Sequence, residues 1–230
     1  MMAPKAPSIA ATDSPGGGER VPRRVLITSG PTREYIDTVR FFSNSSSGKM
    51  GYELARAAGE AGHRVTLISG PTEMPEPSGV EVVQVTTAEE MLGEAERVFA
   101  DCDAAIMAAA VCDYRPVRRA DHKQPKSEAD LTIRLEPTVD ICARLGATKG
   151  DRVLIGFAME DHDHKAHAEA KLQRKGCDAI VLNSVSAAGA SSGCIEVYDP
   201  RHGWSSPVTG TKRVLARAVV AVMDGLLLAR

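Results

Sequence analysis

Short apolar runs alternate with amphipathic segments along most of the chain. Between the runs, apolar positions recur at helical spacing in segments that begin near residues 50, 88, 139, 165 and 212. Successive apolar positions, as expected for strands buried on both faces, occur at residues 24–28, 64–69, 80–85, 104–110, 153–157 and 179–182. This alternation predicts an α/β fold, with a mostly parallel sheet covered by helices on both faces.

Two segments depart from that alternation. Residues 1–22 are rich in Pro, Gly, Ala and Ser, so we expect a disordered leader before a single domain at residues 23–230. Residues 115–136 are charged and lack a period until Leu131–Leu135, which alternates like a half-exposed strand, so we predict a flap or arm there. Residues 195–198 and 203–207 suggest a terminal hairpin. The expected architecture is Rossmann-like with an added arm.

The composition of the chain argues against nucleic acid and membranes as binding partners. The net charge of -2, from 28 basic and 30 acidic residues, gives no reason to expect binding to nucleic acid. No apolar run approaches the roughly 20 residues that span a bilayer. The five cysteines form no CxxC pair and the start of the chain has no signal-peptide core, so we expect a reduced, cytoplasmic protein without a membrane partner.

The stretch SNSSSGKMG at residues 43–51 is the first candidate for chemistry. It joins a predicted strand to a predicted helix, with Ser46 or Ser47 available as N-cap. Ser46, Ser47, Gly48 and Lys49 would therefore surround free backbone N–H groups and the positive end of a helix dipole, which favour a phosphate. The stretch matches neither the P-loop nor the GxGxxG pattern, and a glycine-tightened turn is the alternative.

Asn44 is the strongest candidate for a catalytic residue in this stretch, because its amide can donate and accept beside a reacting carbonyl. Its alternative role is an Asx turn. Upstream, Gly30 belongs to the turn Ser-Gly-Pro-Thr that ends the first predicted strand.

A second candidate follows the fourth predicted strand. Ala109 and Ala110 would let a base or ribose lie against the backbone, and Asp113 could hold Mg²⁺ on a triphosphate, with helix capping as its alternative role. The next loop is basic and could close over a triphosphate, although charge runs are usually solvated surface; its cations are Arg115, Arg118, Arg119, Lys123 and Lys126.

Two further clusters have structural explanations. Helix capping accounts for the Asp and His residues between 161 and 167 better than a metal site does, so we assign no metal there. The cysteines are expected to be buried small hydrophobes.

Taken in order, six segments resemble phosphopantothenoylcysteine synthetase, the ligase half of a bacterial bifunctional flavoprotein of coenzyme A biosynthesis. They span about residues 24–183 and read SGPTREYIDTVRFFSNSSSGKMGYELA, AAAVCDYRP, HKQPK, EPTVDI, GFAMED and KLQRKGCDAIVLN. The resemblance implies ligation of 4'-phosphopantothenate to L-cysteine through an acyl-nucleotidylate, with Mg²⁺ and, in bacterial members, CTP. The residues themselves leave CTP and ATP open.

The resemblance also implies roles for single residues. Asn44 matches the asparagine that holds the acyl intermediate, and Lys123 matches the flap lysine that acts in forming it. Arg40 and Asn44 are expected at the substrate, and Asp113 at the nucleotide and its Mg²⁺. The remaining expected nucleotide contacts are Gly30, Ser46, Ser47, Gly48, Lys49, Ala109, Ala110, Phe157, Lys171 and Lys175.

The resemblance further implies a homodimer in which a strand of the flap, here Leu131–Leu135, pairs across the interface. The chain departs from relatives at Gln124-Pro125, where many have lysine, and at Met159. The flavin-dependent decarboxylase half is absent from this sequence, so no FMN is expected. An NAD(P)-dependent oxidoreductase on the same fold and a nonenzymatic nucleotide-binding sensor are the alternatives.

Overall fold

The computed structural model describes residues 21–126, 130–160, 164–184 and 191–230. The expectation of a disordered leader, and most of the Asp/His cluster at 161–163, therefore lie outside the described residues. Within these ranges, none of the helices combines the length and the apolar character needed to cross a bilayer.

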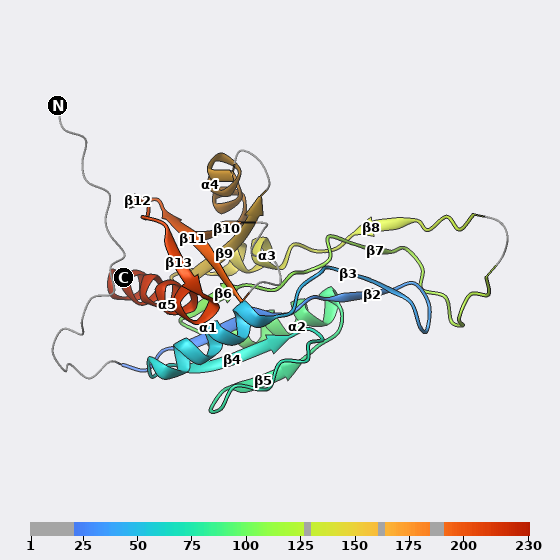
Figure 1. The fold of residues 1–230 in the computed structure, drawn as a ribbon, viewed down its shortest axis with the longest axis horizontal. Helices are drawn as coiled ribbons and strands as arrows, with labels where there is room; N and C mark the ends of the chain where they lie inside the picture. The colour runs from blue at the N-terminus through green and yellow to red at the C-terminus, as the bar shows by residue number, and fades with distance from the viewer. Residues whose placement is uncertain (1–20, 127–129, 161–163, 185–190) are drawn as a thin grey trace.

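One nine-stranded sheet forms the centre of the molecule (Figure 1). Its order is β12-β11-β10-β9-β6-β1-β4-β5, with β13 paired to β11. Neighbours from β5 to β10 are parallel, whereas β11, β12 and β13 pair antiparallel. The mostly parallel sheet predicted from the apolar runs is confirmed. The strands are β1 (Arg24–Ser29), β4 (Arg64–Ser69), β5 (Glu81–Gln84), β6 (Ala104–Met107), β9 (Val153–Glu160), β10 (Ala179–Ser184), β11 (Ser192–Asp199), β12 (Gly203–Trp204) and β13 (Val208–Thr211).

Helices cover both faces of the sheet, as predicted. Alternate residues of β1 point to opposite faces, so Ile27 packs with α1 and α5 while Leu26 packs with α2, α3 and α4. Thr87 and Glu90 form a capping box at the start of α2, which stabilises a helix end by about 1 kcal/mol. The helices are α1 (Lys49–Glu60), α2 (Ala88–Phe99), α3 (Ile141–Thr148), α4 (His164–Lys175) and α5 (Lys212–Leu228).

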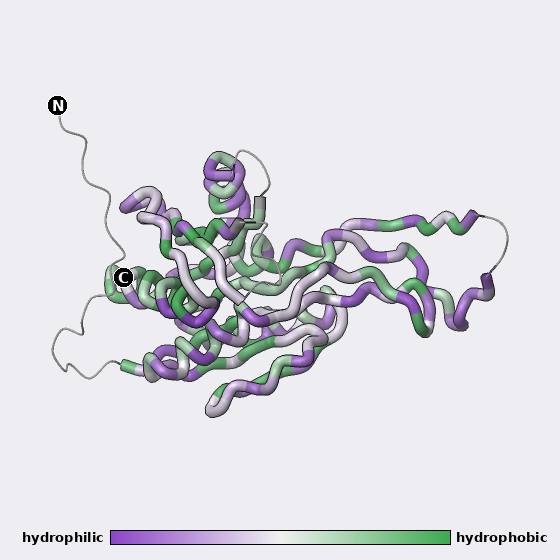
Figure 2. The backbone as a smooth tube through the Cα atoms, in the orientation of Figure 1, coloured by the Kyte–Doolittle hydropathy of each residue, from purple (hydrophilic) through white to green (hydrophobic). Residues whose placement is uncertain are grey.

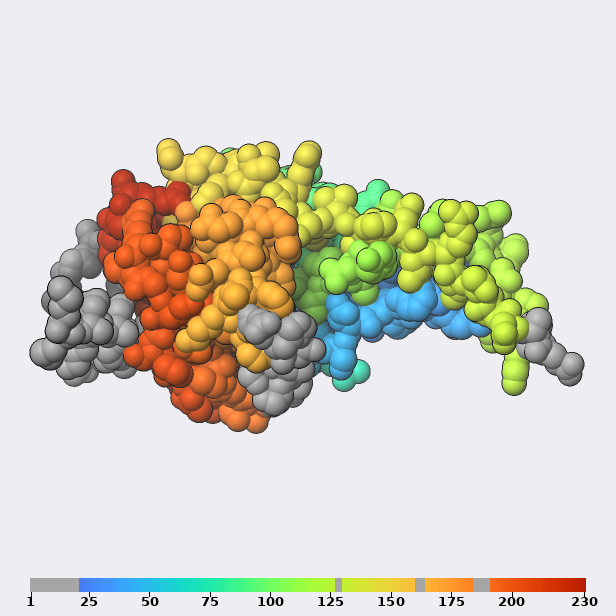
Figure 3. Space-filling model, turned by 90° about the horizontal axis from the view of Figure 1, so that it is seen from above, coloured from blue at the N-terminus to red at the C-terminus, as the bar shows by residue number. Residues whose placement is uncertain are grey.

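An arm projects from the sheet and consists of two strand pairs (Figures 1 and 3). One pair is β2 (Arg33–Tyr35) with β3 (Phe41–Ser43), and the other is β7 (Tyr114–Pro116) with β8 (Leu135–Pro137). Hydrophobic positions in the body follow the sheet and helices, whereas on the arm they are interspersed with hydrophilic ones (Figure 2). Most of the exposed large apolar side chains lie on the arm and its base: Val39, Phe41, Phe42, Tyr114, Val117, Leu131, Leu135 and Val139.

The arm differs in detail from the expectation. Leu131–Arg134 form no strand, and β8 begins only at Leu135. Within this chain the alternation at 131–135 yields a strand only from Leu135, where β7 is the partner, and pairing of Leu131–Leu135 across an interface between two copies stays a prediction. The hairpin of β2 and β3 was missed, since each strand is only three residues long.

Candidate active site

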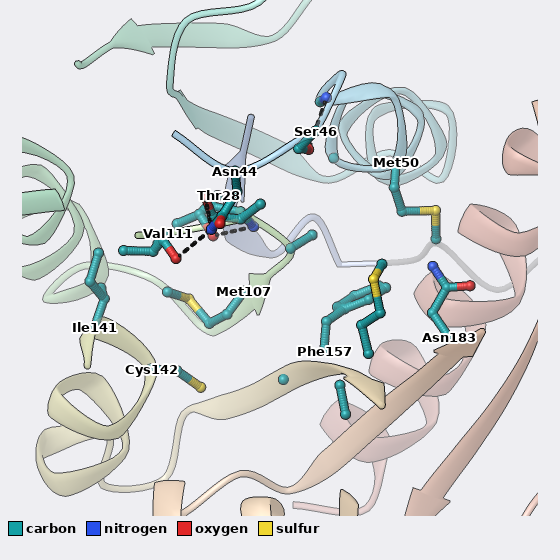
Figure 4. A pocket seen from close by; sticks show the side chains of 18 of the residues that line it. Thr28, Asn44, Ser46, Met50, Met107, Val111, Ile141, Cys142, Phe157 and Asn183 are labelled. Carbon is teal, nitrogen blue, oxygen red and sulfur yellow. Dashed lines mark hydrogen bonds between the residues drawn. The ribbon is translucent and has the colours of Figure 1, made fainter. Parts of the chain in front are cut away.

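A cavity of about 580 Å³ lies at the carboxyl ends of β1, β6 and β9. The sheet order places β1 between β4 and β6, and the connection after β1 runs to β4 while the connection after β6 runs to β9 on the other side, so the two connections diverge there. Open parallel sheets bind ligands at such a crevice. Figure 4 shows side chains from both halves of the sheet pointing into this space.

The loop at residues 44–48 and the first turn of α1 form one wall. The N-cap of α1 is Gly48, with φ 74°, and not Ser46 or Ser47 as predicted, because the chain enters the helix through a left-handed residue. Ser29 Oγ donates to the Gly48 carbonyl at 2.9 Å and is buried, which fixes this turn. The Ser46 and Ser47 hydroxyls instead accept bonds from the N–H groups of Gly48 and Lys49, at 3.3 and 3.5 Å.

Asn44 joins this loop to the end of β6. Its Nδ2 donates to the carbonyl oxygens of Ala110 at 3.1 Å and Val111 at 2.9 Å (Figure 4). The side chain of Asn44 therefore bonds to a distant segment and does not form the local Asx turn that was the alternative. Both bonds use the amide nitrogen, so Oδ1 is the atom of Asn44 that can accept from a ligand.

Small residues after β6 form a floor beside the β1 turn. The Ala109 N–H donates to Thr28 Oγ1 at 3.3 Å, and the Ala110 N–H donates to the Gly30 carbonyl at 2.9 Å. Ala109 and Ala110 line the cavity, and their predicted contact with the nucleotide stays a prediction. Their short side chains leave the backbone within reach of a flat ligand.

Gly30 does not line the cavity, but its backbone conformation forms the turn that lies behind the cavity wall. Its φ is 75°, and a Cβ there would lie 2.9 Å from the Gly70 carbonyl oxygen. The turn predicted at Gly30 is thus confirmed, whereas a direct nucleotide contact stays a prediction.

Four lysines from three parts of the chain line the cavity: Lys49, Lys171, Lys175 and Lys212. Among the described residues, the lining carboxylates are those of Asp113 and Asp140. Lys175 Nζ pairs with Asp140 Oδ2 at 3.0 Å, while Asp140 Oδ1 caps α3 by accepting from the Ala143 N–H. Together with the start of α1, the excess of cations favours an anionic ligand.

The opposite side of the cavity is apolar and includes Met107, Ile141, Cys142 and Phe157. Phe157 was predicted, and it packs partly buried against the core. Cys142 Sγ lies 3.4 Å from Cys177 Sγ, and this thiol contact, together with burial, raises the pKa of Cys142. Cys112 is buried as well, so three of the five cysteines are buried as expected; all five are free thiols.

Arg40 and Lys123 lie on the arm and do not line the cavity of this chain. Arg40 binds the buried Asp37 carboxylate through Nε and Nη2, at 2.9 and 2.6 Å, and donates to the Gln124 carbonyl at 2.8 Å. Lys123 is exposed. The structure therefore brings together most of the predicted site, but not these two side chains.

Several lining residues were not predicted, among them Thr28, Asp140, Asn183 and Lys212. Asn183 ends the matched segment KLQRKGCDAIVLN, which was a usable signal. Lys212 is the first residue of the last helix, and no motif in the sequence marked it as a site residue. Among the described residues, no group of three or more His, Cys, Asp or Glu side chains could hold a metal ion.

Comparison with known proteins identifies the family to which this chain is similar. The family model described as DNA/pantothenate metabolism flavoprotein C-terminal domain matches residues 21–225. The coenzyme A biosynthesis bifunctional protein CoaBC of Bacillus subtilis (strain 168) is 46% identical over 172 residues, which cover 74% of this chain and 42% of that protein. The chain spans about half the length of the curated relatives it matches.

Solved structures agree with this match. The C-terminal domain of a coenzyme A biosynthesis bifunctional protein CoaBC is similar with a TM-score of 0.77 and 37% identity, over 90% of this chain and 97% of that one. A Cab2 mutant in complex with phosphopantothenate-cysteine has a TM-score of 0.75 at 16% identity, over 90% and 88% of the two chains, and supports the fold alone.

Proposed function

The chain belongs to the family of the DNA/pantothenate metabolism flavoprotein C-terminal domain, and from this membership we propose that it is a ligase joining 4'-phosphopantothenate to L-cysteine. The similar CoaBC proteins are named for coenzyme A biosynthesis. One observation carries the proposal: a single cavity unites Asn44, the start of α1 and four lysines.

The reaction requires an activated acid, because a carboxylate is a poor electrophile. In the proposed first step, a carboxylate oxygen of phosphopantothenate attacks the α-phosphorus of a nucleoside triphosphate, forming an acyl-nucleotidylate and releasing pyrophosphate. In the second step, the cysteine amine attacks the acyl carbon and the nucleoside monophosphate leaves. Cations and helix N-termini stabilise the charge that develops on the departing phosphates.

The lining residues suit the parts of this reaction. The N–H groups after Gly48, with Lys49, Lys171 and Lys175, would bind phosphates, and Ala109 and Ala110 would lie under the nucleotide. Asn44 would hold the acyl group through Oδ1, because its Nδ2 is engaged with Ala110 and Val111.

Asp113 fits the Mg²⁺ that such a reaction uses. It is an exposed carboxylate at the cavity, and magnesium is typically held by one or two carboxylates together with substrate phosphates. When bound there, Mg²⁺ would neutralise charge on the triphosphate.

We propose CTP as the nucleotide, by analogy with bacterial members, and no FMN in this chain. ATP is the competing substrate, because the sequence leaves CTP and ATP open. Activity with each nucleotide decides between them.

We further propose that two copies associate through the arm. Exposed apolar side chains that gather in one region mark an interaction surface, and most of the large ones in the described chain lie on the arm and its base. In such a homodimer, the arm of one copy would carry Lys123 toward the cavity of the other. Arg40 would keep the arm in shape, since it ties Asp37 to the Gln124 carbonyl next to Lys123.

The oxidoreductase alternative finds no support at the end of β4. Dinucleotide-binding folds place an acidic side chain there for the ribose, whereas this chain has Ser69. Ser69 is buried and its hydroxyl lies 3.2 Å from Tyr52 Oη. A nonenzymatic nucleotide-binding sensor is distinguished from a ligase by turnover.

The test is an assay with phosphopantothenate, cysteine, Mg²⁺ and either CTP or ATP, followed by measurement of pyrophosphate and of CMP or AMP. Stoichiometric pyrophosphate, monophosphate and amide product support the proposal. Absence of product with every nucleoside triphosphate would reject it.

A further inference from the structure

Two buried thiols lie in contact at the apolar wall of the cavity. Cys142 is in the first turn of α3 and Cys177 is in the turn between α4 and β10; their sulfurs are 3.4 Å apart, and the two residues are 8% and 6% exposed. Cys142 lines the cavity and Cys177 does not. Figure 4 shows the Cys142 sulfur pointing away from α3, toward the sheet. One sulfur therefore borders the cavity, and the other lies directly behind it.

The backbone around the pair permits close approach. Gly146 lies one turn after Cys142 on the same face of α3, and a Cβ at Gly146 would be 1.9 Å from the Lys175 carbonyl oxygen. On the sheet side, a Cβ at Gly156 of β9 would lie 3.0 Å from Cys177 Sγ and 3.7 Å from Cys142 Sγ. Glycine at these two positions lets α3 pack directly on the turn after α4, and it leaves room for both sulfurs over β9.

The surroundings of the pair favour a thiolate. The thiol contact with Cys142 lowers the pKa of Cys177, against the opposing effect of burial. The positive charges of Lys175 and Lys149 lower it further. Cys102 is a contrast, because it is only partly buried and that burial raises its pKa to about 11. Since the thiolate is the nucleophile, the buried pair should be oxidised before the more accessible Cys102.

We propose that Cys142 and Cys177 form a redox-sensing dithiol, which a hydroperoxide entering the cavity converts to a disulfide and a small-molecule thiol reduces again. In a reducing compartment such a disulfide is transient and serves sensing. The disulfide weakens the binding of anions in the cavity.

The oxidation can be written in two balanced steps. In the first, the proton of Cys142 passes to the Cys177 thiolate, and the Cys142 sulfur attacks hydrogen peroxide. An S–O bond forms, the O–O bond breaks, and the departing hydroxide takes the proton of Cys177 and leaves as water. In the second, the Cys177 thiolate attacks the sulfenic sulfur of Cys142, so that the S–S bond forms and hydroxide leaves, to be protonated by solvent. The two sulfurs lose two electrons, and one peroxide molecule gains them.

The disulfide would act on the cavity through Lys175. Asp140 and Lys175 each lie two residues from a bridging cysteine, and their side chains are paired at 3.0 Å. An S–S bond is about 2.05 Å long, so the bridge would draw the first turn of α3 toward Cys177 and hold Asp140 against Lys175. Lys175 lines the cavity, and a cation held by a carboxylate attracts a phosphate less strongly. This step rests on the proposed function only for the identity of the anion.

The test treats the full chain with hydrogen peroxide, blocks the remaining thiols with iodoacetamide, and maps disulfides by mass spectrometry of unreduced peptides. We expect a Cys142–Cys177 bridge that dithiothreitol removes. Cys102→Ala is the matched control and should form the bridge as wild type does. Calorimetric titration with inorganic pyrophosphate should show about tenfold weaker binding by the oxidised chain, restored by dithiothreitol. Peroxide should leave the affinity of Cys142→Ala unchanged; circular dichroism checks that this variant is folded.

The outcomes separate this inference from the proposed function. Oxidation of Cys102 while Cys142 and Cys177 remain thiols overturns the inference, and so does a bridge that leaves the pyrophosphate affinity of wild type unchanged. A loss of affinity that also occurs in folded Cys142→Ala overturns it too, because oxidised methionines would then be the cause. If the bridge forms and weakens pyrophosphate binding in a chain without ligase activity, the inference stands and the proposed function fails. Ligase activity without a bridge has the opposite meaning.

Discussion

The amide nitrogen of Asn44 lies 2.9 Å from the carbonyl oxygen of Val111, and this bond connects the loop before α1 to the segment after β6. The two segments are brought together by the parallel pairing of β1 with β6. The residue assigned to the acyl group is therefore also a fixed part of the cavity.

Changing Asn44 to Asp replaces this donor with an oxygen that faces the carbonyls of Ala110 and Val111. We expect pyrophosphate release for a single turnover to persist while amide product falls by about a hundredfold or more, because repulsion from the two carbonyls moves the side chain out of the position from which Oδ1 holds the acyl group. Rapid-quench measurement of both products tests this. Gln84→Glu, an exposed amide-to-acid change on β5, is the control and should be silent. Equal loss of pyrophosphate and product would contradict the assignment.

Lys123 lies on the arm, outside the cavity of its own chain, so the dimer proposal predicts complementation between two inactive variants. Lys123→Gln is expected to suppress formation of the acyl-nucleotidylate, and Asn44→Asp its conversion. In an equal, randomised mixture, each mixed dimer contains one site with both native residues, and about a quarter of the wild-type activity should return. Lys149→Met in place of Lys123→Gln supplies the matched control, since its sites should be active without mixing. A mixture that stays inactive after confirmed subunit exchange argues against a shared site.

Substitution by alanine is expected to have opposite effects on stability at Gly70 and at Gly93. A Cβ at Gly70 would lie 1.9 Å from the Pro31 carbonyl oxygen, whereas a Cβ at Gly93, inside α2, meets no atom within 4 Å. Gly70→Ala should therefore destabilise the fold by about 1–3 kcal/mol or more. Gly93→Ala should stabilise it by about 0.5–1 kcal/mol, because alanine favours the helix. Urea unfolding measures both, and similar values for the two variants would refute this packing.

Elements with strong local signals were predictable from sequence. The bounds of β4 and the first residue of α5 match the prediction, because a continuous apolar run and a long amphipathic period depend little on the rest of the chain. The capping box of Thr87 and Glu90 is likewise contained in four residues. Of the predicted site, the residues in matched segments at strand ends line the cavity, including Asn44, Asp113 and Phe157.

What could not be predicted depends on distant pairing. Lys212 reaches the cavity because β13 pairs antiparallel with β11, which positions the start of α5 near Lys49. No local pattern encodes that proximity. The arm strands are three residues each, too short for a period, so the place of Arg40 against Asp37 also required the structure.

Asp37 makes the arm sensitive to acid. Its buried carboxylate accepts from the N–H groups of Arg40, Val39 and Gln124, at 2.8, 2.8 and 3.2 Å. The backbone N–H of Arg40 is the largest influence holding the pKa of Asp37 far below its usual range, against the opposing effect of burial. The remaining bonds, including those from the Arg40 guanidinium, lower the pKa further.

Because the folded pKa lies below the unfolded one, of about 3.9, Asp37 stabilises the fold fully above that unfolded value and loses this contribution progressively as the pH falls from it toward the lower folded pKa. Asp37→Asn cannot ionise, and its NH₂ group would face donors. We therefore expect a lower urea midpoint than wild type at pH 7 and a smaller difference at pH 3. Asp121→Asn, at an exposed position of the arm, serves as the control and should follow wild type at both values. A gap between Asp37→Asn and wild type that is the same at pH 7 and pH 3 would mean that the charge of Asp37 does not hold the arm.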